Sequence, residues 1–325
     1  MSTDQNIVVD RALGSLIGLA IGDALGTTFE GGPRRQPDSR IAMTGSGPYH
    51  LEPGQWTDDT AMALCVADSL IANGSAIRHR DLMDRFAGWM TEGQNSCTGD
   101  AFDVGVTTRG SISEFIETRN PITGPTGRDG AGNGGIMRLS PAVLANLKDE
   151  RSAAVAAVEQ SRTTHGAPQC LEAAEFMARL LHRLVLRPTA ADPQHVSMAG
   201  DYVEPEIARL TDMTCRVPNR DGIRSTGYVV HTLEAAIWSF VTTRSFEDAL
   251  SAAINLGGDT DTIGAVAGQI TGAAYGLSAI PREWVDLLAW HDDIIVRGRK
   301  LIAMSDAPPR RSMLDRLVDG VRGRR

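Results

Sequence analysis

The chain has 325 residues, of which 42% are hydrophobic and 22% charged, and this composition excludes a disordered or collagen-like protein. Its net charge of -8, without a long basic stretch, argues against a protein dedicated to binding nucleic acid. The four cysteines lie far apart, and the polar N-terminus lacks the pattern of a signal peptide. We therefore expect a cytoplasmic protein with a substantial core and no disulfide framework.

Two apolar segments carry glycine at every fourth position. The first contains Gly14, Gly18, Gly22 and Gly26. The second lies near the other end of the chain and contains Gly264, Gly268, Gly272 and Gly276. Each glycine inside a helix costs about 0.8–1 kcal/mol relative to alanine, so another interaction has to offset that cost. Close approach of two helix backbones would do so, and we predict that these helices lie deep in the fold, against each other.

Apolar residues at helical spacing predict further helices over residues 59–72, 80–90, 105–117, 141–147, 152–161, 168–186, 228–241, 246–254 and 281–304. Hardly any segment alternates with the period of a strand. The intervening segments 31–54, 91–100, 120–135 and part of 188–226 are rich in turn-forming residues, but none has the composition of a flexible linker. We predict an all-α fold with one large domain over 11–304, an N-terminal tail over 1–10 and a basic C-terminal tail over 305–325.

The uncharged segment 262–280 is long enough to raise the possibility of a membrane span. Its residues are mostly glycine, alanine and threonine, and neither a second hydrophobic segment nor a flanking basic belt accompanies it. We therefore predict a buried helix in a protein that binds no membrane, and we expect a monomer.

Two acidic clusters begin predicted helices that are far apart in the sequence: Thr57-Asp58-Asp59-Thr60 and Asp259-Thr260-Asp261-Thr262. Either cluster alone is most simply explained as a helix N-cap. One carboxylate would suffice for that role, and adjacent carboxylates repel each other unless a cation or a proton lies between them. Ligands that are all oxygen atoms favour Mg²⁺ or Mn²⁺ over zinc or copper. Together, the two clusters favour a metal site.

A third acidic element lies at the end of the first glycine-rich helix. Asp23 falls in its last turn, where a carboxylate is unfavourable to the helix dipole and needs a partner. Glu30 follows the expected helix end at Gly26, so a loop can direct it toward the same cations, where a carboxylate can hold or activate a water molecule.

These elements occur in a recognisable order of motifs: GDALG followed by Glu30, WTDDT, GNGGIMR, TTHG, GYVVHTLEAAIW and GGDTDTIGA. In these motifs, which span Gly22 to Ala265, the chain resembles the ADP-ribosylglycohydrolases of the DraG and ARH type. The resemblance implies an all-helical fold with two divalent cations, Mg²⁺ or Mn²⁺, at the base of a cleft that accepts ADP-ribose.

The resemblance also implies roles for individual residues. The metal ligands of the family correspond to Thr57, Asp58, Asp59, Asp259, Asp261 and Thr262. Glu30 matches the glutamate beside the metals that is implicated in catalysis or substrate gating, and we expect it to be catalytic together with Asp59 and Asp259. The substrate loop of the family corresponds to Gly132, Asn133 and Gly134, and backbone donors in such a loop suit a diphosphate.

Two further residues have both a functional and a structural interpretation. His165 resembles the family histidine near the phosphates of ADP-ribose, although a histidine at the end of a helix would explain it equally simply. Tyr228 matches a tyrosine that lines the cleft, and its structural alternative is a core aromatic residue at the start of a helix.

Asp103 bears on which linkage is cleaved. In the arginine-specific branch of the family a similar segment lines the mouth of the cleft, and a carboxylate there can pair with a guanidinium group through two hydrogen bonds. This chain has Ala101 and Val106 where that branch has cysteine and asparagine, which weakens the assignment to arginine without removing it. Capping of the next helix is the structural alternative for Asp103.

The resemblance thus implies a metal-dependent hydrolase that removes mono-ADP-ribose from modified protein side chains, with arginine favoured, and releases ADP-ribose. Cleavage at the anomeric carbon develops oxocarbenium character, so the site needs a held diol, an activated water and help for the leaving group. Hydrolysis of a serine or O-acyl linkage is the first alternative. The second is a non-catalytic ADP-ribose-binding protein on the same fold, and a metal phosphohydrolase that cleaves the diphosphate is the third.

Overall fold

The computed structural model describes residues 3–187, 192, 198, 200–211 and 218–306. Within these residues every regular element is a helix, and β-type pairing is limited to two isolated bridges. The prediction of an all-α fold is confirmed. None of the helices in the described ranges is both long enough and apolar enough to span a membrane.

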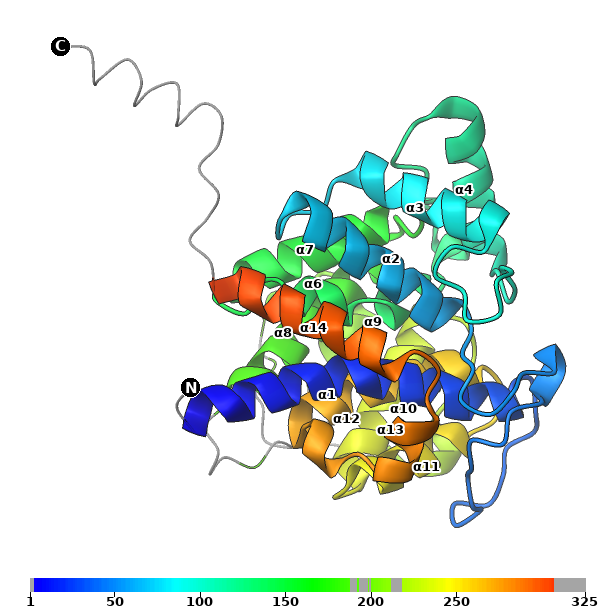
Figure 1. Cartoon of the computed structure of the whole chain (residues 1–325). Helices are drawn as coiled ribbons and strands as arrows, with labels where there is room; N and C mark the ends of the chain where they lie inside the picture. The colour runs from blue at the N-terminus through cyan, green and yellow to red at the C-terminus, as the bar shows by residue number, and fades with distance from the viewer. Residues whose placement is uncertain (1–2, 188–191, 193–197, 199, 212–217, 307–325) are drawn as a thin grey trace.

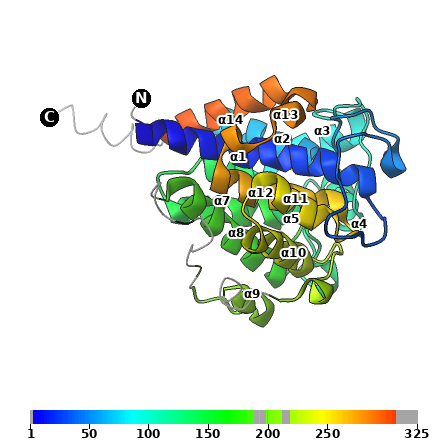
Figure 2. The ribbon, with the colours of Figure 1, turned by 90° about the horizontal axis from the view of Figure 1, so that it is seen from below.

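Two glycine-rich helices, α1 (Thr3–Gly26) and α12 (Thr260–Tyr275), form an antiparallel pair in the middle of the molecule (Figure 2). A Cβ atom added at Gly14 would lie 2.5 Å from the carbonyl oxygen of Gly272, and one at Gly18 would lie 2.9 Å from the carbonyl carbon of Gly268. Real Cβ atoms do not approach backbone atoms this closely, so the two backbones touch with no side chain between them. The predicted packing of the two glycine-rich helices against each other is confirmed.

The remaining helices surround this pair (Figure 1). Their bounds are α2 Asp58–Asn73, α3 His79–Glu92, α4 Val106–Thr118, α5 Gly134–Met137, α6 Ser140–Leu144, α7 Glu150–Arg162, α8 Pro168–Leu186, α9 Pro205–Leu210, α10 Val229–Thr242, α11 Phe246–Ile254, α13 Arg282–Leu287 and α14 His291–Asp306. Helices α2 and α14 lie on one side of the central pair, and α8 and α10 lie on the other (Figure 2).

The single helix predicted over 281–304 is wrong, because the structure has two helices there, α13 and α14. Between them Trp290 adopts a left-handed backbone conformation, with a φ of 59°. Its ring packs edge-on against Trp56, with 5.4 Å between the ring centroids. A tertiary contact therefore accompanies the break in the helix. Two short helices, α5 and α9, were not predicted.

The predicted N-terminal tail is also different in the structure, because α1 already begins at Thr3. Asp10, at the end of that predicted tail, accepts hydrogen bonds from the backbone N–H of Ser278 at 3.0 Å and from its hydroxyl at 2.9 Å. Residues 3–10 are thus part of the first helix. Most of the predicted C-terminal tail, residues 307–325, lies outside the described residues.

Candidate active site

The N-terminus of α2 is capped by Asp23, which lies near the end of α1. The carboxylate of Asp23 accepts hydrogen bonds from the backbone N–H groups of Thr57, at 2.9 Å, and Thr60, at 3.0 Å, and from both hydroxyls. Burial raises the pKa of Asp23 to about 6, although these four hydrogen bonds lower it. The partner that Asp23 needs is therefore the start of a second helix.

Glu30 has the same role at α12. One of its carboxylate oxygens, Oε2, accepts a hydrogen bond from the backbone N–H of Thr260 at 2.7 Å. The residues at the N-cap positions of α2 and α12, Thr57 and Asp259, make no capping hydrogen bond with their own side chains. Capping therefore does not explain the two acidic clusters, because carboxylates from another segment already cap both helices.

The two helix starts bring the acidic residues together. Carboxylate oxygens of Glu30, Asp259 and Asp261 all lie within 4.8 Å of one another. Asp59 is nearby, because its Oδ2 accepts a hydrogen bond from the hydroxyl of Thr262 at 3.4 Å. Its other oxygen, Oδ1, is buried without a hydrogen-bond partner in the described part of the chain. Such an oxygen atom is available to a cation.

The acidic group is also electrostatically unfavourable as it stands. Burial raises the pKa of Asp58, Asp59 and Asp261 well above the usual range, and neighbouring carboxylates raise each of them further. A divalent cation among these oxygens would offset both the burial and the repulsion. All the available donors are oxygen atoms, which suits Mg²⁺ or Mn²⁺. The residues present therefore fit the cations that the sequence implies.

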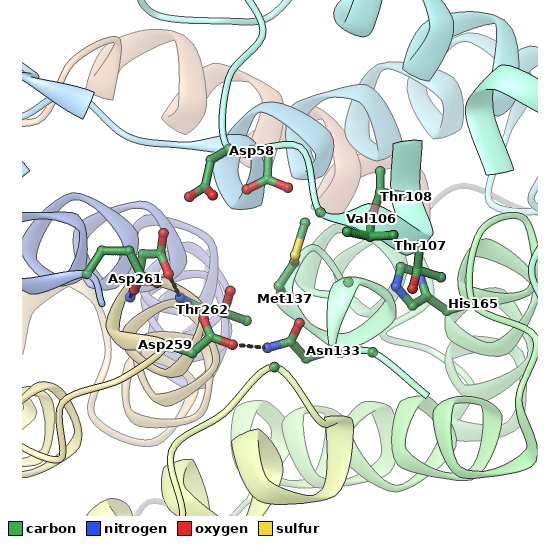
Figure 3. A pocket seen from close by; sticks show the side chains of 16 residues that line it. Asp58, Val106, Thr107, Thr108, Asn133, Met137, His165, Asp259, Asp261 and Thr262 are labelled. Atoms are coloured by element: carbon green, nitrogen blue, oxygen red, sulfur yellow. Dashed lines mark hydrogen bonds between the residues drawn. The ribbon is translucent and has the colours of Figure 1, made fainter. Parts of the chain in front are cut away.

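A cavity of about 390 Å³ opens beside this group. Asp58, Asp259 and Asp261 lie on one side of it, and His165 lies on the opposite side with Thr107, as Figure 3 shows. The predicted site residues that line the cavity are Glu30, Asp58, Asp103, Gly132, Asn133, Gly134, His165, Asp259, Asp261 and Thr262. Thr57 and Asp59 lie behind this lining, where both are buried and hydrogen-bonded to each other.

The glycine-rich loop is tied to the acidic site through the side chain of Asn133, and its contact with substrate stays a prediction. The side-chain amide of Asn133 donates to Oδ2 of Asp259 at 2.7 Å and to the hydroxyl of Thr232 at 3.0 Å, so it orients an acidic residue (Figure 3). The backbone N–H groups of Gly132 and Asn133 already donate to carbonyl groups of the protein. Of the three loop residues, only Gly134 keeps a backbone donor that no described residue occupies.

The imidazole ring of His165 borders the cavity, and only 2% of the surface of the residue is exposed. Nδ1 lies 2.9 Å from the hydroxyl oxygen of Thr164. Burial lowers the pKa of His165 to about 3, and the nearby guanidinium of Arg138 lowers it as well. A Cβ atom at Gly134 would lie 2.5 Å from Cε1 of the ring, so the loop needs glycine there to accommodate the imidazole.

Tyr228 is not brought into the cavity. Its hydroxyl donates to Glu206 at 2.6 Å, and its ring packs edge-on against His231, with 4.9 Å between centroids. Its backbone pairs with Gly132 in an isolated bridge. Tyr228 thus supports the glycine-rich loop through its backbone, and a direct contact with substrate stays a prediction.

Asp103 lines the cavity from the loop before α4, with a left-handed φ of 54°. Gly105 occupies the N-cap position of α4, so Asp103 does not cap that helix. The carboxylate of Asp103 instead accepts a hydrogen bond from the hydroxyl of Tyr49. Tyr49 was missed in the sequence, because it lies in the irregular segment 31–54 and no spacing relates it to Asp103.

Comparison with known proteins gives the family of the chain. A family model described as ADP-ribosylglycohydrolase matches residues 4–311. The chain is 37% identical over 315 residues to ADP-ribosylarginine hydrolase Tri1 of Pseudomonas putida strain GB-1, covering 97% of this chain and 83% of that protein. It is 33% identical over 285 residues to ADP-ribosyl-(dinitrogen reductase) glycohydrolase of Rhodospirillum rubrum, covering 86% of this chain and 91% of that protein.

The fold agrees as well. A solved chain described as an ADP-ribosylglycohydrolase-related protein complex is similar with a TM-score of 0.77 and 36% sequence identity, covering 92% of this chain and 99% of that chain. The family match extends over nearly the whole length, including both acidic helix starts. The chain belongs to the ADP-ribosylglycohydrolase family and is a glycohydrolase.

Proposed function

We propose that this enzyme removes mono-ADP-ribose from modified arginine side chains of proteins, in a reaction that depends on two divalent cations, and releases ADP-ribose. The observation that carries the proposal is the cavity with buried carboxylates on one side and Asp103 in its lining. The identity to an ADP-ribosylarginine hydrolase adds to it.

The cations would be held by the six residues that the resemblance names: Thr57, Asp58, Asp59, Asp259, Asp261 and Thr262. The unpartnered Oδ1 of buried Asp59 and the raised pKa values of the aspartates support this assignment. When bound, divalent cations supply positive charge and Lewis acidity at this end of the cavity.

Side chains of the protein transfer the proton and orient the acidic residues. Oε2 of Glu30 accepts a hydrogen bond from the first residue of α12, which fixes the position of the carboxylate. Burial raises the pKa of Glu30, so this carboxylate is suited to take a proton from an attacking water. Asn133 holds Asp259 in place.

Asp103 is suited to orient the arginine leaving group. A carboxylate has about four lone-pair sites, and the hydroxyl of Tyr49 occupies one of them. The remaining sites can receive the guanidinium group, whose planar fork matches a carboxylate. This favours arginine over serine, because a serine oxygen has neither the positive charge nor the two parallel donors that a guanidinium offers to a carboxylate.

The test compares ADP-ribose release from arginine-linked and serine-linked substrates by the wild type, Asp103→Asn and Asp100→Asn. Asp100 is an exposed acidic residue in the same loop and serves as the matched control. We expect Asp103→Asn to lower kcat/KM on the arginine substrate by about 10- to 100-fold, the loss of one charge-assisted interaction. Asp100→Asn should retain activity. Faster release from the serine substrate by the wild type would contradict the arginine assignment.

We also propose that the protein is cytoplasmic and monomeric, with one domain that includes all of α1 from Thr3. Three cysteines, Cys65, Cys97 and Cys170, are free thiols, which suits a reducing compartment. Light scattering of the purified protein would test the oligomeric state, and a dimer mass would contradict the monomer.

A further inference from the structure

Arg138 is a buried cation without a carboxylate partner among the described residues. It has 0% exposed surface. Its guanidinium donates to the side-chain oxygen of Gln160 at 2.9 Å, to the backbone oxygen of Gln160 at 3.2 Å and to the hydroxyl of Thr164 at 2.7 Å. Burying a guanidinium without an ion pair is costly. We therefore expect its hydrogen bonds to serve a function.

The contact with Thr164 determines where a proton lies. Arginine has only donors, so the hydroxyl oxygen of Thr164 accepts from Arg138. The same oxygen lies 2.9 Å from Nδ1 of His165. If Nδ1 carried a proton, Thr164 would accept twice, and its own hydroxyl proton would be buried without an acceptor among the described residues, which is unfavourable. The hydroxyl therefore donates to Nδ1.

The consequence appears on the other side of the imidazole ring. A neutral histidine whose Nδ1 accepts a hydrogen bond carries its proton on Nε2. Nε2 faces the glycine-rich loop, because a Cβ atom at Gly134 would lie 3.0 Å from it and one at Gly132 would lie 3.1 Å from it. The ring lines the cavity opposite the carboxylates (Figure 3). In the described part of the chain, no protein group accepts a hydrogen bond from Nε2.

We propose that Arg138 and Thr164 are positioning residues that hold His165 as the neutral tautomer with its proton on Nε2, so that the cavity presents a fixed N–H donor to an anionic oxygen of the substrate. The identity of that oxygen, in the diphosphate of ADP-ribose, rests on the proposed function. The tautomer itself does not, because it is a property of the protein without a ligand.

The cation has a second effect on the same ring. Burial lowers the pKa of His165, and the positive charge of Arg138 lowers it further. The imidazole therefore stays neutral at neutral pH, and the Nε2–H donor keeps one charge state. An exposed histidine, with an ordinary pKa of about 6.5, would change its charge in this range.

Nitrogen NMR of the full chain with ¹⁵N-labelled histidine reads the tautomer directly. Loss of one set of signals in His165→Gln assigns the resonances. In the wild type we expect Nδ1 to have the shift of an unprotonated ring nitrogen and Nε2 that of a protonated one, unchanged from pH 6 to pH 8. Thr164→Ser keeps the hydroxyl and should keep this pattern, whereas Thr164→Val, of the same shape without the hydroxyl, should mix or reverse the tautomers.

Arg138→Met tests the other positioning residue. Without the arginine donor, Thr164 can accept from Nδ1 as easily as it donates to it, so we expect a mixture of tautomers. Thermal melts establish that the variant is folded. A protonated Nδ1 in the wild type would overturn the proposal, and an unchanged pattern in folded Arg138→Met would overturn the role of Arg138.

Calorimetric titration with ADP-ribose in the presence of Mg²⁺ measures how much the Nε2–H donor of His165 contributes to the affinity for ADP-ribose. We expect Thr164→Val to bind about tenfold more weakly, as for the loss of one hydrogen bond to a charged group, and Thr164→Ser to bind like the wild type. Equal affinity in Thr164→Val with an altered tautomer would overturn the donor role. Failure of the wild type to hydrolyse arginine-linked ADP-ribose would contradict the proposed function and leave the tautomer result unaffected.

Discussion

Gly26 links the packing of the two central helices to the acidic site, and Gly26→Ala tests that link. Gly26 is the last residue of α1, and its backbone has a φ of -67°, which alanine adopts without strain. A Cβ atom there would lie 2.5 Å from the Cα of Asp261 and 2.6 Å from the carbonyl carbon of Thr260. Both neighbours are backbone atoms at the start of α12, so no side chain can rotate away.

The size of the effect follows from these distances. Ordinary van der Waals contact begins at 3.4 Å, so moving the Cα of Asp261 from 2.5 to 3.4 Å needs a shift of about 0.9 Å. Metal sites tolerate about 0.2 Å in ligand distances, so the shift should weaken cation binding markedly. Overpacking of a core costs typically about 1–3 kcal/mol, and the helix preference of alanine returns at most about 1 kcal/mol. Because the clash is with backbone atoms that cannot rotate away, the upper part of that range, about 2–3 kcal/mol, applies, and we expect a net loss of about 1–2 kcal/mol in the free energy of unfolding.

Two measurements on the same variant check the reasoning. Urea unfolding gives the free energy of unfolding, and calorimetric titration with Mn²⁺ gives the cation affinity. Gly110→Ala is the matched control, because Gly110 is an exposed residue of α4 and a Cβ atom there meets nothing within 4 Å. The control should be slightly more stable than the wild type. A Gly26→Ala protein with wild-type stability and wild-type Mn²⁺ affinity would refute the argument.

Three further predictions concern the site. Asp259→Asn should lower turnover by at least about 100-fold with an unchanged circular dichroism spectrum, whereas exposed Asp292→Asn should keep activity; a fully active Asp259→Asn would exclude the proposed role. Burial raises the pKa of Asp58 and Asp59 in the folded protein, so the folded state binds more protons than the unfolded state. Metal-free protein should therefore lose stability as pH rises above about 4, the ordinary aspartate pKa, and Mg²⁺ should raise Tm more at pH 8 than at pH 6. An equal shift at both pH values in thermal melts would argue against cation binding there. Tyr49→Phe leaves Asp103 without its donor and should lower kcat/KM on arginine-linked substrate about 3- to 10-fold; unchanged kinetics would remove Tyr49 from the account.

The fold was predictable where the signal is local and repeated. Glycine at every fourth position indicated close packing of two helices, because glycines are unfavourable inside a helix unless another backbone packs directly against them. The break between α13 and α14 was not predictable, because the left-handed conformation of Trp290 accompanies a contact with Trp56 from a distant segment. Periodicity alone cannot detect such a contact.

The site divides in the same way. The acidic residues are visible in the sequence, because carboxylates that close together are hard to explain without a cation. The supporting contacts are not visible: Asn133 with Asp259, Tyr49 with Asp103, and Arg138 with Thr164 join segments far apart in the chain or depend on the direction of one side chain. Even Asp23, which clearly needed a partner, could be matched to the start of α2 only in three dimensions.

The central claim is that the buried carboxylates beside the cavity hold the divalent cations on which ADP-ribosyl hydrolysis depends. The most direct measurement is the release of free ADP-ribose from a mono-ADP-ribosylated arginine substrate by the purified protein, with Mg²⁺, with Mn²⁺ and with EDTA. We expect release with a divalent cation, none in EDTA, and recovery when the cation is restored. Undiminished release in EDTA would contradict the claim.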